Sequence, residues 1–186
     1  MPTPVIQSFA PLRGKFSAIL TVILLACLAP LSWAQDASEA EPLPTIGPDS
    51  GLPLPRFVAL RSDEARMRVQ PSVDHAIAYI YLREGLPMKV LEERGDWRRV
   101  ADHEGKEGWM NIIVLSNDRT FRVLSPLANL YARADRNAPV RAEMEAGVIG
   151  DLRQCRADGW CRADVQGVTG WLEAIDVWGV LPGETF

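Results

Sequence analysis

The stretch WRRVADHEGKEGW at residues 97–109 is written a second time, as WCRADVQGVTGW at residues 160–171. Each copy begins on tryptophan, has an arginine two positions later followed by Val or Ala, and ends on Gly-x-x-Gly-Trp. In both copies a further glycine, Gly85 or Gly147, lies 23 residues before the glycine of the final Gly-Trp pair. A repeat of about 60 residues indicates two small modules rather than one large enzyme domain.

Short apolar stretches alternate with turn residues in both copies. The first copy has expected strands at residues 76–82, 88–91, 97–100 and 109–115. The second has expected strands at residues 152–156, 160–165 and 171–175. Strands this short, with turns about every 8–12 residues and no long helical period, predict an all-β fold made of small barrels.

The N-terminal segment has a different character. Arg13 and Lys15 precede an apolar run over residues 16–31, and small residues follow it. A basic start, an apolar middle and a small-x-small end are typical of a secretory signal peptide. We therefore expect residues 1–34 to be a signal peptide that is cleaved after Ala34.

Two other interpretations of this segment stay open. Residues 16–34 are just long enough to act as an uncleaved membrane anchor, although they contain Pro30. The residues before Cys27 loosely resemble a lipobox, which would place a lipid on that cysteine.

The net charge of the mature chain argues against binding to nucleic acid. Cleavage would remove two of the 20 basic residues and none of the 24 acidic ones, which leaves about six net negative charges. Such a chain is not attracted to nucleic acid or to anionic lipid by its overall field. We expect a periplasmic or secreted location, no membrane contact after cleavage and no cofactor.

A proline-rich segment separates the N-terminal segment from the repeats. Residues 35–56 contain five prolines and several acidic residues, without a sustained apolar period. Proline keeps such a chain extended, and its few apolar residues cannot form a core. We therefore expect a linker at residues 35–56, followed by domains at residues 57–118 and 119–186.

The repeated W-x-R-[VA] and G-x-x-G-W motifs, behind a segment such as Met67–Ser72, resemble the bacterial SH3-like (SH3b) family. The resemblance covers nearly all of residues 57–176, and the ending Trp178–Glu184 is similar to that of exported tandem members. It implies two tandem five-stranded barrels after the signal peptide and linker. It also implies a non-catalytic protein that binds peptidoglycan or another protein. The second copy departs from the pattern at Leu130–Ala134.

Hairpin geometry predicts a disulfide between Cys155 and Cys161. If residues 157–159 form a three-residue loop, these cysteines oppose each other across the hairpin, with Cα atoms about 4.5–5.5 Å apart. Closing a loop of about seven residues contributes roughly 2 kcal/mol in the chain-entropy model. The alternative is a pair of free thiols, which is less usual in an exported chain. In the first copy the same reasoning places Glu93 opposite Arg98, as an ion pair worth about 0.2–1 kcal/mol.

Four aromatic residues are the candidates for ligand binding. If Val100 and Ala163 fill the barrels, strand alternation puts Trp97 and Trp160 on the outer faces. Aromatic outer faces of SH3-type barrels bind peptide-like ligands, and the alternative role is packing. Tyr79 and Tyr81 extend this candidate groove. Trp109 and Trp171, each directly after a glycine expected in a turn, are expected in the cores.

Enzymatic and metal-binding interpretations have little support. The sequence has no Gly-x-Ser-x-Gly, His-Glu-x-x-His or phosphate-loop motif. Asp102-His103-Glu104 has metal-ligand residue types, but neighbours on a strand point in opposite directions, so we expect a solvated turn and no metal. Arg61, Arg66 and Arg68 form a small basic cluster able to contact a carboxylate.

The leading hypothesis is a cell-envelope module that recognises peptidoglycan or its stem peptides. Its rival is a protein-interaction scaffold or regulator of an envelope protein, and a third class is a cryptic wall hydrolase. We expect the first copy to serve binding and the second, with its disulfide, to serve stability.

Overall fold

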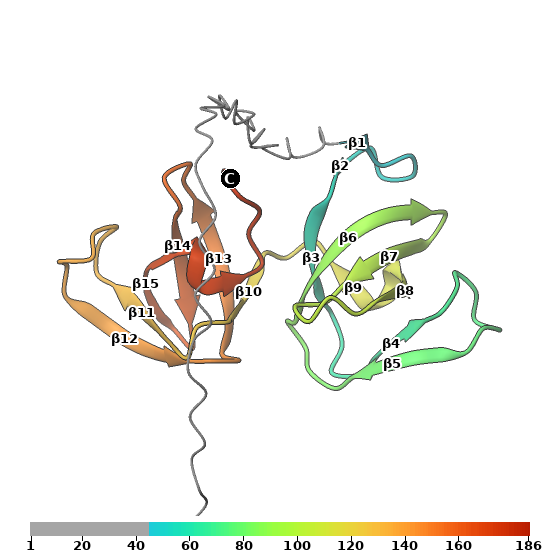
Figure 1. The fold of residues 1–186 in the computed structure, drawn as a ribbon, viewed down its shortest axis with the longest axis horizontal. Coiled ribbons are helices and arrows are strands. Elements are labelled where there is room, and N and C mark those ends of the chain that lie inside the picture. The colour runs from blue at the N-terminus through green and yellow to red at the C-terminus, as the bar shows by residue number, and fades with distance from the viewer. Residues whose placement is uncertain (1–44) are drawn as a thin grey trace, which may run out of the picture. The chain divides into compact units, whose positions relative to one another are not determined.

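Residues 45–186 form a short hairpin and two seven-stranded antiparallel sheets, as described by a computed structural model (Figure 1). We call residues 56–116 module 1 and residues 120–178 module 2. The predicted signal peptide, and linker residues 35–44, lie outside the described residues. Within residues 45–186, no helix has the length and hydropathy to cross a membrane.

Module 1 is a sheet with the strand order β5-β4-β8-β7-β6-β3-β9. Its elements are β3 (Arg56–Leu60), β4 (Ala65–Arg68), β5 (Ile77–Tyr81), β6 (Pro87–Arg94), β7 (Trp97–Ala101), β8 (Glu107–Asn111), the 3-10 helix η1 (Ile112–Val114) and β9 (Leu115–Ser116). The hairpin β1 (Thr45–Ile46) and β2 (Pro53–Leu54) precedes it.

Module 2 repeats this order as β12-β11-β15-β14-β13-β10-β16. Its elements are β10 (Thr120–Val123), β11 (Leu127–Tyr131), β12 (Val140–Glu145), β13 (Ile149–Cys155), β14 (Trp160–Val165), β15 (Val168–Glu173), the 3-10 helix η2 (Ala174–Asp176) and β16 (Val177–Trp178). The equivalent orders confirm the predicted all-β class and the two tandem SH3-like barrels.

Strand alternation sets the two cores as predicted. Val100 of β7 and Ala163 of β14 have no exposed surface, and each belongs to the hydrophobic core of its own module. Trp97 and Trp160 start these strands three residues earlier and are partly exposed, outside both cores. The parity argument therefore holds in both copies.

The repeated Gly-Trp glycines are required where two strands cross at close range. A Cβ on Gly108 of β8 would lie 2.5 Å from the Met67 side chain and 2.8 Å from the Arg68 carbonyl oxygen. In module 2, a Cβ on Gly170 of β15 would lie 2.6 Å from Leu130 and 2.7 Å from a backbone oxygen. These glycines lie within strands, not in turns, and they permit close approach of two backbones.

The hairpin at residues 45–54 shows that the linker prediction was wrong for this part of the chain. Here the chain folds back on itself, with the Gly47 amide donating to the Leu52 carbonyl, 2.8 Å. Leu54 is buried and belongs to the core of module 1. A segment with many prolines therefore covers one corner of a module instead of acting as a free tether.

Glu93 of β6 anchors this hairpin. The two-residue turn pairs Glu93 with Arg98, as predicted, but the carboxylate is fully buried and not a surface group. It accepts hydrogen bonds from the Asp49 and Ser50 amides at 3.0 and 2.9 Å and from the Ser50 hydroxyl at 2.6 Å. It also pairs with Arg56, 2.8 Å, and with Arg98, 3.3 Å. Burial alone would raise the pKa of Glu93, but the hydrogen bonds from Ser50, Arg56 and Asp49 outweigh it and lower the pKa to about 2.

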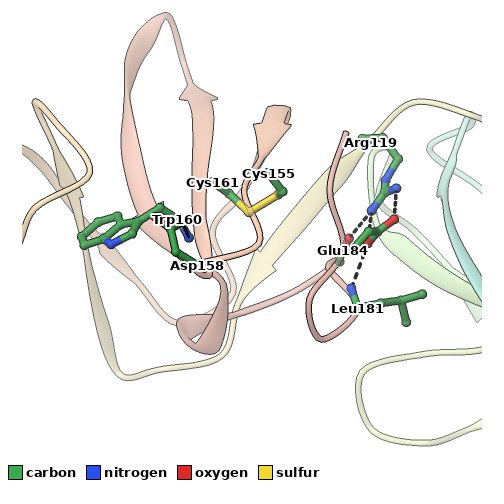
Figure 2. The surroundings of a disulfide bond; sticks show 8 residues. Arg119, Cys155, Asp158, Trp160, Cys161, Leu181 and Glu184 are labelled. Atoms are coloured by element: carbon green, nitrogen blue, oxygen red, sulfur yellow. Dashed lines mark hydrogen bonds and ion pairs between the residues drawn. A yellow bond between two sulfur atoms is a disulfide. The ribbon is translucent and has the colours of Figure 1, made fainter. Parts of the chain in front are cut away.

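In module 2 the predicted disulfide joins Cys155 and Cys161, whose Cα atoms are 4.1 Å apart (Figure 2). These residues oppose each other across the β13–β14 hairpin, and Gly159 closes its turn with a φ of 84°. Cys155 and Cys161 form the second residue pair from the turn. Glu93 and Arg98 form the equivalent pair in module 1.

The C-terminal tail, residues 179–186, covers this disulfide-bearing corner. The Cys155 amide donates to the Phe186 carbonyl at 3.1 Å, and the Phe186 amide donates back at 3.3 Å. Arg119 holds Glu184 through two hydrogen bonds of 2.6 and 2.9 Å (Figure 2). The Arg119 guanidinium group also lies 4.3 Å from the Phe186 ring centroid. Each module thus has this corner covered by a segment from outside its repeat.

Candidate ligand-binding surfaces

Trp97 lines a cavity of about 280 Å³ on the outer face of module 1. The other lining residues come from β4, the β4–β5 loop and the end of β8 with η1: Glu64, Arg66, Arg68, Val73, Asn111, Ile113 and Val114. Aromatic, apolar and charged groups meet here, which suits a ligand with both apolar and ionic parts.

Trp160, the equivalent residue of module 2, is also partly exposed and packs against a neighbouring ring. Its ring contacts Tyr131 edge-on, with centroids 5.6 Å apart and planes at 78°. Tyr131 pairs with Trp171 across the sheet, just as Arg68 pairs with Trp109 in module 1. The same position thus carries a ring that packs on Trp160 in one module and an arginine beside Trp97 in the other.

Tyr79 and Tyr81 line a different cavity, of about 290 Å³, together with Met88, Asp102 and Lys106, among others. The Tyr81 hydroxyl donates to the Asp102 carboxylate at 2.9 Å. Burial and this hydrogen bond raise the pKa of Tyr81. The Lys106 ammonium lies 5.4 Å from the Tyr79 ring centroid.

Asp102 corrects the expectation of a solvated turn at residues 102–104. It is buried, and its carboxylate accepts the amides of Glu104 and Lys106, both at 2.9 Å, in addition to the Tyr81 hydroxyl. The carboxylate therefore organises the turn. Among residues 45–186, no three histidine, cysteine, aspartate or glutamate side chains are grouped as metal ligands would be.

The four aromatic candidates do not form one groove. Tyr79 pairs with Met67, which is buried in the core, so both lie on the inner face of the β4–β5 ribbon. Arg66 and Arg68, which share the cavity of Trp97, are offset from Met67 by one residue and lie on the opposite face. The ribbon therefore separates the tyrosine cavity from the tryptophan cavity.

Trp109 and Trp171 were both expected in the cores, and the structure bears this out only for Trp109, which is buried, whereas Trp171 is partly exposed. Neither ring belongs to the main hydrophobic cluster of its module. The strand neighbours of Trp109, Gly108 and Met110, face inward, so its ring lies on the outer face under the Arg94 guanidinium, 5.0 Å from the centroid. Trp178 makes a contact that the sequence did not predict. Its ring packs edge-on against Phe57 of module 1, with centroids 5.1 Å apart, so the tryptophan that joins the modules lies outside the repeated motif.

The model of the bacterial SH3 domain family matches residues 61–117 and again residues 125–179. The chain belongs to the bacterial SH3 domain family. The two matches fall on module 1 and module 2, so the family assignment and the repeated strand order agree. SH3 domains of this family are typically binding domains. A comparison with curated proteins finds no match.

Several solved structures are similar to the chain. NlpC2 and NlpC1 from Trichomonas vaginalis are each 14% identical, with a TM-score of 0.31; the aligned part covers 67% and 71% of this chain and 48% of each of theirs. An NlpC/P60 family protein from Bacillus cereus is 16% identical, with a TM-score of 0.30, over 66% of this chain and 55% of that one. The chain thus spans about half the length of these proteins.

Proposed function

We propose that the protein is a non-enzymatic binding protein of the bacterial cell envelope, which recognises peptidoglycan or its stem peptides through module 1. The observation that carries the proposal is the difference between the two equivalent tryptophans. Trp97 lines a cavity beside Arg66 and Arg68, whereas Trp160 is packed against Tyr131.

The chemistry of the Trp97 cavity fits a peptide that carries charges. The indole offers a flat apolar surface, and guanidinium groups bind carboxylates in a planar, bidentate manner. Arg66 is tied to Glu64 at the rim, 2.9 Å, and Arg68 donates to the His75 carbonyl, 2.6 Å, so both arginines are already oriented. The disulfide in module 2 supports an exported location, because such bonds persist in oxidising compartments.

A pull-down with purified, insoluble peptidoglycan tests this function. We expect the wild type to be retained and Trp97→Ala to lose most of its retention. Trp160→Ala is the matched control, because it removes the equivalent ring from module 2 and should be retained like the wild type. Failure of the wild type to bind, or equal retention of the two variants, would contradict the proposal. Release of soluble wall fragments by the purified protein would instead indicate a hydrolase.

The rival function, interaction with an envelope protein, is favoured by a separate feature, the edge strand β5. Ile77, Tyr79 and Ile80 of this strand are about 40–50% exposed, and residues 77–81 contain no charge. The equivalent edge strand of module 2, β12, carries Arg141, Glu143 and Glu145. Charges on an edge strand oppose pairing with another chain, and an uncharged edge permits it.

Substitution on β5 separates the two functions. Ile80→Lys places a charge on the exposed edge at a residue that does not line the Trp97 cavity. If the protein acts on an envelope protein by strand pairing, crosslinking in intact cells should lose a partner in this variant. Retention on peptidoglycan should stay unchanged.

A further inference from the structure

A second cavity of module 1, of about 370 Å³, lies next to the Trp97 cavity and has a different lining. Three arginines, Arg56, Arg61 and Arg98, line it from β3, the end of β3 and β7. The apolar lining comes from the N-terminal hairpin, β3, η1 and β9, and consists of Leu52, Val58, Ile112, Ile113 and Leu115. Ile113, which is 72% exposed, lines both this cavity and the Trp97 cavity.

The arginines leave this cavity with an excess of positive charge. Within the described part of the chain, Glu93 is the only carboxylate paired with them, through Arg56 and Arg98. Arg61 forms no ion pair with any residue in 45–186. Three guanidinium groups against one carboxylate give an excess of two positive charges within a partly enclosed space, where Coulomb interactions are less screened than in water.

The hydrogen bonding of Arg56 points in the same direction. Its side chain is 14% exposed, and its Nη2 contacts Glu93, but Nε and Nη1 are buried without an acceptor among the described residues. Buried donors without an acceptor are rare and energetically unfavourable. A second carboxylate in the cavity would therefore be stabilised by the positive charge of this group.

The backbone holds Arg61 at the rim of the cavity, next to η1. Its amide donates to the Val114 carbonyl at 2.9 Å, and β3 pairs with β9 one residue earlier. Its side chain is exposed and lines the cavity. Ser116 and Asn117, also in the lining, add polar groups on the same side.

We propose that this cavity binds the free carboxylate of a short peptide whose neighbouring side chains are small and aliphatic. Arg61 makes the direct contact with the carboxylate, and Arg56 and Arg98 supply the positive field. The apolar side chains of Leu52 and Ile112 contact the aliphatic groups of the peptide. The assignment deepens the proposed function and rests on it, because the shared Ile113 allows one peptide to reach from this cavity to Trp97.

The test is an NMR titration of the full chain with N-acetyl-alanyl-alanine and with the same dipeptide blocked as its C-terminal amide. We expect the acid to shift the amides of residues 112–117 and the amide-blocked form to bind at least about tenfold more weakly, since a charged hydrogen bond is lost. Arg61→Gln should weaken binding of the acid by a similar factor. Arg94→Gln, an exposed arginine of module 1 that lines neither this cavity nor the Trp97 cavity, is the matched control and should leave binding unchanged.

Equal binding of the acid and the blocked dipeptide, or unchanged binding by Arg61→Gln, would overturn the assignment. So would shifts confined to other parts of module 1. The peptidoglycan pull-down reports on the proposed function separately. Acid binding that depends on Arg61 would support the carboxylate site even if the wild type were not retained on the wall. If the Arg61→Gln variant binds the acid as tightly as the wild type, the carboxylate site is wrong, even when retention on peptidoglycan depends on Trp97.

Discussion

Replacement of the buried Glu93 by glutamine removes the charge that holds the N-terminal hairpin on module 1. The variant keeps the shape of the side chain but leaves Arg56 and Arg98 without their counter-charge. Removing one partner from a buried ion pair costs about 3–5 kcal/mol. We expect Glu93→Gln to destabilise module 1 by about 3 kcal/mol at pH 7.

The pKa of Glu93 gives an independent value for the same effect. Its pKa falls from the ordinary 4.5 to about 2 in the folded protein. A carboxyl group whose pKa is lowered by folding stabilises the fold above its unfolded pKa, and this contribution disappears as the pH falls through the folded pKa. The difference corresponds to about 3 kcal/mol, lost mainly between pH 5 and pH 2.

Urea unfolding, followed at the amide signals of the module 1 core and repeated from pH 7 to pH 2, measures both effects. The wild type should lose about 3 kcal/mol more than Glu93→Gln over the acid range. Glu92→Gln is the matched control, because the neighbouring carboxylate is 41% exposed and its ion pairs are worth at most about 1 kcal/mol. Parallel pH profiles for the wild type and Glu93→Gln would refute the reasoning.

Three further predictions concern the cores and the turns. Replacing Cys155 and Cys161 together by serine should lower the stability of module 2 by about 2 kcal/mol in denaturant unfolding, with module 1 unchanged, because a seven-residue loop is no longer closed. Gly108→Ala and Gly170→Ala should each cost about 1–3 kcal/mol in their own module by urea unfolding, since the added Cβ meets backbone and buried side chains. Tyr81 should ionise at a higher pH than an unperturbed tyrosine in an ultraviolet titration, and Tyr81→Phe should remove that late step. The raised pKa contributes stability that is present at neutral pH and is lost as the pH rises through the folded pKa.

The fold could be predicted from local rules because the repeat, the turn lengths and the strand alternation are all written in short stretches. The length of each turn fixed the register of two hairpins, and it placed Cys155 opposite Cys161 and Glu93 opposite Arg98. The role of Gly108 was misread, because a glycine that admits a crossing strand looks the same in sequence as one in a turn.

The surroundings of the candidate residues could not be predicted in the same way. Strand alternation placed Trp97 and Trp160 on the outer faces. Their neighbours on those faces, Arg68 for Trp97 and Tyr131 for Trp160, come from another strand. The burial of Glu93 depends on Ser50, 43 residues away. Long-range partners of this kind have no local signature.

The covered corners mean that the repeat unit and the independently folding unit are not the same segment. A fragment that began at residue 57 would lack Leu54, which would expose part of the module 1 core. It would also leave the Glu93 carboxylate without its amide donors. A fragment of module 2 that ended at residue 178 would lose the Phe186 hydrogen bonds to Cys155. Duplication of the 60-residue unit alone therefore yields two barrels that each have one uncovered corner. The flanking segments at residues 45–54 and 179–186 cover these corners.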